Sequence, residues 1–270
     1  MELVSLLRMS SCIVLTSTGG SKSFDHSNIR AVADHARSHI EILESWRRVL
    51  PPFLAWKDGD PPATDLNVAR LRAKYYGGLY MMLRPYLRIA THVIEYPPSH
   101  QSSDRNVQWS HQNSPATTGE VSTPTSRQMV DLSETQEKIV QVACQCIESA
   151  IQSTIAFDRV GAPENSPYEG YKSSRNTRLV LTNIFGTLHA QFGNILVLAA
   201  VIKSKLYPHL PSDTSLTPKN LDALFERTLA LLDEVAPNSP ILRVDYDILK
   251  NVRAQLVAEG QLPVPYNHRE

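Results

Sequence analysis

The sequence predicts an all-α protein, with about six substantial helices packed into a single domain over residues 1–270. Apolar side chains recur every three or four positions in several long segments, which is the period of an α-helix. Prolines outnumber glycines, 18 to 11, and two of them follow a serine or threonine that can cap a helix. No segment has the convincing alternating pattern of a half-buried strand, so we expect no sheet.

The first part of the chain predicts two helices joined by a proline-rich loop. Residues 29–50 are charged and apolar at helical spacing, and the following pair of prolines ends that helix. Residues 65–96 have the clearest pattern, with apolar positions from Leu66 to Ile94 in steps of three and four. Either Thr64 or Asp65 can cap this second helix.

The second helix contains three residues that favour bending. Pro85 removes a backbone donor and should kink the axis, close to Gly77 and Gly78, which let another backbone approach. We therefore expect a hinge at Gly77, Gly78 and Pro85.

A polar segment separates this helix from the next. Residues 98–130 are rich in Ser, Gln, Asn, Thr and Pro and have too little apolar surface to offset the entropy of ordering, so we expect a disordered insertion. The run from Asp131 to Glu134 resembles a capping box and predicts a helix that ends near Phe157.

The most apolar segment, residues 177–207, has no formal charge between Leu179 and Ile202. Its length could span a bilayer, but several polar side chains would then lie in hydrocarbon, which favours a central buried helix. Three small residues that share one face of this helix suit close packing of another helix: Gly186, Ala190 and Gly193. Thr217-Pro218 and Ser239-Pro240 then predict the start of two final helices.

Charge and cysteine content exclude some function classes. The 27 basic residues balance the 27 acidic ones, so no net field attracts nucleic acid or an anionic membrane. Three scattered cysteines are too few for a disulfide framework and indicate a reducing compartment. Met1–Leu15 lacks the basic start of a signal peptide, and we interpret it as the tail of an amphipathic helix.

The sequence contains no recognisable catalytic or metal-binding motif. The local motifs of acyl, phosphoryl and hydride transfer are absent, so we expect no catalytic residue and no cofactor. His35 and His39 have metal-ligand spacing but no third ligand, and Cys144 and Cys146 do not form a CxxC pair, so we expect no metal. The enzymatic alternative is a buried polar site around His189, with Asn183 and Gln191 on the same helix.

A row of basic residues follows the helix over residues 65–96. Arg70, Lys74, Arg84 and Arg88 each stand one position past the apolar stripe, about 100° around the helix. Carboxylates from neighbouring helices could neutralise them; alternatively, they bind a small anionic effector or an acidic protein partner. Tyr75 beside the two glycines adds flat surface that could line a pocket.

Two stretches resemble a known family. The first comprises Trp46–Pro51, Trp56, Asp60–Pro62, Ala69–Gly77 and Arg84–Leu87; the second comprises Cys146-Ile147, Ala156–Asp158 and Thr182–Asn194. Together they resemble the regulatory region of fungal Zn(II)2Cys6 binuclear-cluster transcription factors. The resemblance implies an all-helical region of the fungal-specific transcription factor regulatory type, which restrains or transmits activity in response to metabolites.

The chain departs from that family in its DNA-binding residues. The family holds two zinc ions with six closely spaced cysteines, and this chain has three scattered ones, so we expect no direct DNA binding. It is then either a truncated product or a free-standing domain that acts through protein contacts and could form a homodimer. The resemblance implies a nuclear location, with the cytoplasm as the alternative, and a role in controlling a metabolic or secondary-metabolite gene cluster.

Overall fold

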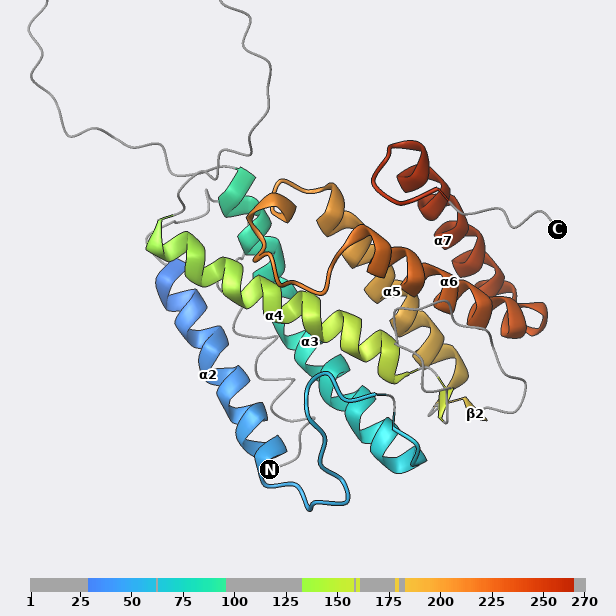
Figure 1. Ribbon diagram of the computed structural model, residues 1–270, viewed down its shortest axis with the longest axis horizontal. Helices are drawn as coiled ribbons and strands as arrows, with labels where there is room; N and C mark the ends of the chain where they lie inside the picture. The colour runs from blue at the N-terminus through green and yellow to red at the C-terminus, as the bar shows by residue number, and fades with distance from the viewer. Residues whose placement is uncertain are drawn as a thin grey trace, which may run out of the picture.

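Six α-helices form nearly all the regular structure in the part of the chain that this computed structural model describes, residues 29–61, 63–95, 133–157, 159–160, 178–179 and 183–264. The all-α prediction is therefore confirmed (Figure 1). The expected insertion at 98–130 and the expected helix tail at Met1–Leu15 lie outside the described residues. The helices are α2 (Ile29–Arg48), α3 (Leu66–Glu95), α4 (Glu134–Ala156), α5 (Ile184–Lys203), α6 (Pro218–Val235) and α7 (Pro240–Ala258).

Helix α4 lies between two groups of helices (Figure 1). On one side it packs against α2 and, over its whole length, against α3; on the other side it packs against α5 and α6. Helix α7 completes the second group by packing on α5 and α6. The buried face of α4 is correspondingly wide and includes Ile139, Cys146 and Ile151, each fully buried.

Side-chain caps fix where most helices begin. Asp65 caps α3 by accepting hydrogen bonds from the backbone N–H groups of Asn67 and Val68, at 2.9 and 3.0 Å. Thr217 and Ser239 cap α6 and α7 as predicted, each followed by proline at the first helical position. In α4 the capping box is formed by Ser133 with Gln136, two residues later than the sequence pattern indicated.

Helix α5 is shorter than the predicted helix over 177–207, because the side chain of Asn183 caps it and accepts a hydrogen bond from the N–H of Gly186 at 3.1 Å. The prediction that its small residues pack against another helix was wrong: Gly186 and Ala190 are exposed, and a Cβ added to Gly193 would meet nothing within 4 Å. The buried face instead contains Asn194, which reaches partners on α4.

Among the described residues, α5 is the one helix that is long and apolar enough to cross a membrane. Half of that apolar window is buried inside the protein.

Two short strands were not expected from the sequence. Arg159–Val160 (β1) pairs antiparallel with Arg178–Leu179 (β2), just before α5. Strands of two residues are too short for an alternating pattern to reveal.

Candidate functional site

The basic residues on α3 form a narrow exposed stripe on a helix that is otherwise largely buried. Lys74, Arg84 and Arg88 are exposed, and we call these three residues the basic stripe. At 100° per residue all three lie within about 80° of one another around the helix. Met81 lies on the same side, in the middle of the stripe, and is 64% exposed.

No carboxylate neutralises the basic stripe within the described ranges. Lys74, Arg84 and Arg88 form no ion pair there, whereas Arg47 and Arg253 each do. Arg70 differs from them, since it is half-buried and has interactions of its own. The four basic residues named from the sequence therefore divide into one that is engaged and three whose charges face solvent.

Tyr75 does not belong to this surface. It is 2% exposed, and its ring stacks on Trp46 with ring centres 6.2 Å apart, while the guanidinium of Arg47 lies 5.3 Å from its centre. Burial raises the pKa of Tyr75 to about 12. Tyr75 is thus a core residue, and we no longer count it among the candidate ligand-binding residues. It is buried because α3 packs against neighbours on several sides and not along one apolar stripe alone.

At Gly77, helix α3 packs against the end of α4 with room for a methyl group but not for a larger side chain. A Cβ added at Gly77 would lie 3.4 Å from the hydroxyl oxygen of Ser153 on α4 and 3.7 Å from the ring of Phe157, which follows α4. Helix α3 runs without interruption from Leu66 to Glu95 through Gly77, Gly78 and the half-buried Pro85. A role of these three residues as a hinge stays a prediction.

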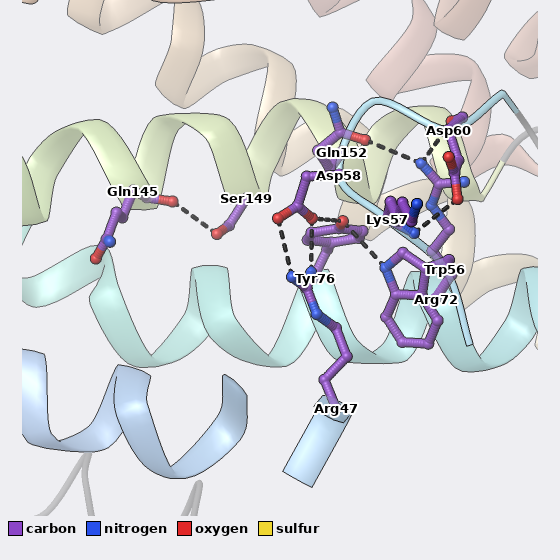
Figure 2. Close-up of polar contacts among 10 residues, drawn as sticks. All are labelled: Arg47, Trp56, Lys57, Asp58, Asp60, Arg72, Tyr76, Gln145, Ser149 and Gln152. Atoms are coloured by element: carbon purple, nitrogen blue, oxygen red, sulfur yellow. Dashed lines mark hydrogen bonds and ion pairs between the residues drawn. The ribbon is translucent and has the colours of Figure 1, made fainter. Parts of the chain in front are cut away.

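A cluster of polar and aromatic side chains attaches the loop after α2 to α3, as Figure 2 shows. Arg47 donates two hydrogen bonds to the carboxylate of Asp58, at 2.6 and 2.9 Å. The Tyr76 hydroxyl donates to the same carboxylate and accepts a hydrogen bond from the Trp56 indole N–H at 3.1 Å. We call Arg47, Trp56, Asp58 and Tyr76 the loop cluster. Its bonds fix the position of the first half of α3.

The protonation states in the loop cluster follow from these bonds. The hydrogen bond from Arg47 lowers the pKa of Asp58, against an opposing effect of partial burial. The same bond raises the pKa of Arg47. Burial, and then the bond to Asp58, raise the pKa of Tyr76. The cluster therefore holds a carboxylate, a guanidinium and a neutral phenol at neutral pH, which suits a structural contact.

Arg72 is a buried cation that the sequence analysis missed. It is 4% exposed and donates to the backbone carbonyl of Pro61 at 2.9 Å. It also donates to the backbone carbonyl of Asp60 at 2.8 Å (Figure 2). Its guanidinium also lies 6.0 Å from the ring centre of Tyr76. Because its two shorter hydrogen bonds go to backbone carbonyls of a loop, no pattern of side chains could have revealed them.

The residues of the enzymatic alternative do not converge on one site. Asn183 caps α5, and Gln191 is 2% exposed on the buried face. The side chain of His189 is 53% exposed, so the prediction of a buried polar site there was wrong. His189 Nδ1 does lie 3.0 Å from Oδ2 of Asp245, a carboxylate on α7 that is 4% exposed.

No group of three or more potential ligand side chains in the described segments could hold a metal ion. His35 and His39 contact each other edge to face, with ring centres 4.4 Å apart.

Comparisons with known proteins do not assign the chain to a family. No family model, curated protein or solved structure matches it. The resemblance to the regulatory region of fungal zinc-cluster transcription factors accordingly stays a proposal. Arguments about function depend on the geometry of the chain itself.

Proposed function

We propose that this protein is a regulatory domain, of the type found in fungal zinc-cluster transcription factors, that binds an acidic segment of a protein partner along the basic stripe of α3. The single observation that carries this proposal is the absence of any neutralising carboxylate around Lys74, Arg84 and Arg88 in the described residues. Like charges on one helix face repel each other, and an acidic partner would remove that repulsion.

The spacing of the stripe favours an extended partner over a small anionic effector. Lys74 and Arg84 are ten residues apart, or about 15 Å along the helix axis, which is too far for one small anion to contact both. Arg84 and Arg88 are one turn apart and could share a carboxylate. The exposed Met81, between Lys74 and Arg84, offers a flexible apolar contact. An acidic helix with one apolar residue near its middle fits this arrangement.

The resemblance supports the regulatory part of the proposal. The resembling runs include Trp56, Arg72 and Tyr76, which the structure brings together around the start of α3. In this proposal the chain acts in the nucleus, with the cytoplasm as the alternative, and influences a fungal metabolic gene cluster through a partner without contacting DNA. The balanced charge of the chain is in keeping with a protein partner.

The experiment is a binding titration with a fluorescent peptide of about five helical turns, rich in glutamate and with a central leucine, followed by anisotropy. We expect binding that weakens as salt is added, since the contacts are exposed ion pairs. Changing Lys74, Arg84 and Arg88 together to glutamate should weaken binding by roughly 3- to 150-fold, because three exposed pairs of about 0.2–1 kcal/mol each are lost.

The matched control changes three exposed lysines outside α3 to glutamate: Lys57, Lys205 and Lys219. Both triple variants alter the net charge equally, so a specific stripe predicts that the control binds like the wild type. Equal weakening by the two variants, or no binding by the wild type, would refute the proposal. Tight binding of citrate or inorganic phosphate that displaces the peptide would favour a small anionic effector instead.

One observation favours an enzymatic alternative, namely the contact between His189 and Asp245. A buried carboxylate that orients an imidazole is an arrangement used in general-base catalysis. Its test is hydrolysis of a panel of activated ester, amide and phosphate substrates by the wild type and by His189→Ala. Activity that disappears in His189→Ala would support this alternative, and equal rates for the two proteins would exclude a role for the pair.

A further inference from the structure

Helices α5 and α7 run parallel and in constant register. His189 on α5 contacts Asp245 on α7, and Lys203 at the end of α5 contacts Glu259 just after α7 at 2.9 Å. Each pair is separated by 56 positions in the sequence. The 14 residues between the two contacts extend about 21 Å along each helix, so the helices keep the same register over that length. The same offset puts Phe185 level with Ile241 along the two helices.

The two helices present a shared apolar face to solvent. It comprises four large apolar side chains, each 39–55% exposed, which we call the α5–α7 face: Phe185, Ile241, Val244 and Ile248. On α7 the exposed positions are spaced by three and four residues, as on one side of a helix. The opposite flank of α7 contacts α6 through Arg253, which bonds Asp222 and Glu226. The exposed positions therefore lie on the α5 side.

The imidazole of His189 joins the two halves of this face. Its ring stacks between Phe185 and Phe192, with ring centres 5.6 and 5.5 Å apart, and its Nδ1 contacts Asp245. Asp245 is followed by Ile248 and preceded by Ile241 on the same side of α7. Because the buried carboxylate has a partner, the face could be covered without leaving that charge unpaired.

The size of the face is close to that of the apolar part of a protein interface. Taking a full accessible area of roughly 200 Å² per side chain, the four residues expose about 380 Å². A standard interface buries about 800 Å² on each partner, somewhat more than half of it apolar. Apolar patches of this size on a soluble protein commonly mark an interaction site.

The charges beside the face are self-complementary. Arg243 and Asp247 lie one turn apart on the edge of α7 beyond Val244, away from α5; both are exposed, and within the described residues neither forms an ion pair. A two-fold axis makes the same patch serve both partners, so that residue i of one chain meets residue j of the other and the reverse. Arg243 can then meet Asp247 of the partner subunit twice in one interface. A different protein with a uniformly acidic or basic surface would place a like charge against one of these two residues.

We propose that the α5–α7 face is the interface of a two-fold homodimer, in which α5 and α7 of one chain pack against the same helices of a second copy. This inference is independent of the basic stripe on α3. Dimerisation would bring together two copies of the domain and leave the stripe of each copy accessible to its own partner segment.

The experiment measures the mass of the full chain by sedimentation velocity over a hundredfold range of concentration. We expect a dimer that dissociates on dilution. Ile241→Glu and Val244→Glu should each raise the dissociation constant by about a hundredfold, because they put a charge into the centre of the interface. The control is Phe53→Glu, since Phe53 is 75% exposed in the loop after α2 and should leave the dimer unchanged.

A charge exchange tests the two-fold geometry without altering the apolar core. Arg243→Glu and Asp247→Arg should each weaken the dimer roughly tenfold. An equimolar mixture of the two variants should recover dimers that contain one copy of each. In such a dimer the two changed positions meet with opposite charges, and the unchanged Asp247 of one chain meets the unchanged Arg243 of the other. This charge exchange still tests the dimer if Ile241→Glu or Val244→Glu fails to fold, a failure that circular dichroism would reveal.

A chain that stays monomeric at every concentration would overturn the proposal, as would a dimer that Ile241→Glu and Val244→Glu leave intact. Binding of the monomer to lipid vesicles through this face would overturn it in favour of a membrane surface.

Discussion

Removing the hydroxyl of Tyr76 should destabilise the protein by about 2 kcal/mol, within a range of about 1–3. In Tyr76→Phe the ring stays packed against Trp56 and Tyr75, and only the oxygen is lost. The main cost comes from the Trp56 indole N–H, which loses its acceptor. Because Trp56 is only 9% exposed, water cannot readily replace that acceptor. Asp58 contributes less, because it keeps both bonds to Arg47 and its side chain is 65% exposed to water.

The matched control is Tyr86→Phe on the same helix. Tyr86 is 1% exposed, and within the described residues its hydroxyl has no hydrogen-bond partner. Losing that oxygen should therefore leave stability unchanged or raise it slightly. The two substitutions remove the same atom from the same residue type, so their difference isolates the hydrogen bonds.

Urea denaturation followed by helical circular dichroism measures the unfolding free energy of both variants, and thermal melts followed in the same way measure their Tm. For a domain of this size the Tyr76 substitution should lower Tm by roughly 4–8 °C. If Tyr76→Phe is as stable as the wild type, or if Tyr86→Phe costs as much, the loop cluster does not stabilise the fold as argued.

Three further predictions concern other contacts. Gly77→Ala should be neutral or stabilising by up to about 1 kcal/mol, whereas Gly77→Leu should destabilise by about 1–3 kcal/mol because α4 leaves no space. A higher Tm for Gly77→Leu than for Gly77→Ala would contradict the close packing of α3 against α4 at this position. Because Arg47 lowers the pKa of Asp58 below 3.8, the stability that Asp58 contributes should be present above pH 4 and lost as pH falls through the lower folded value. The difference in unfolding free energy between wild type and Asp58→Asn should accordingly shrink in acid; a constant difference would argue against the ion pair. Burial raises the pKa of Cys144 to about 12 and also raises that of Cys146, so alkylation mapped by peptide mass spectrometry should be slow at both until urea is added. Rapid labelling of the native protein at either position would contradict this packing.

The helices and several of their caps could be predicted because those signals are local. The three- and four-residue spacing on α3 gave its extent, and Asp65, Thr217 and Ser239 cap helices as their positions indicated. The exposure of the basic stripe also followed from its offset from the apolar positions. Each of these features depends on residues within a few positions of one another.

The features that sequence reasoning missed depend on long-range neighbours. Tyr75 stands off the apolar stripe, but α3 has neighbours on several sides, and periodicity does not say how many partners a helix has. Arg72 is buried because loop carbonyls of Asp60 and Pro61 accept its hydrogen bonds. His189 meets a carboxylate 56 positions away, a distance over which no local pattern is informative.

Since α4 is the helix on which both groups of helices pack, neither group has a complete core without it. We therefore expect the folded state to melt in one cooperative transition, with the two halves losing their structure together. Fragments divided within α4 should each fail to fold, and coexpressing them should restore helical content only by reassembling that central helix.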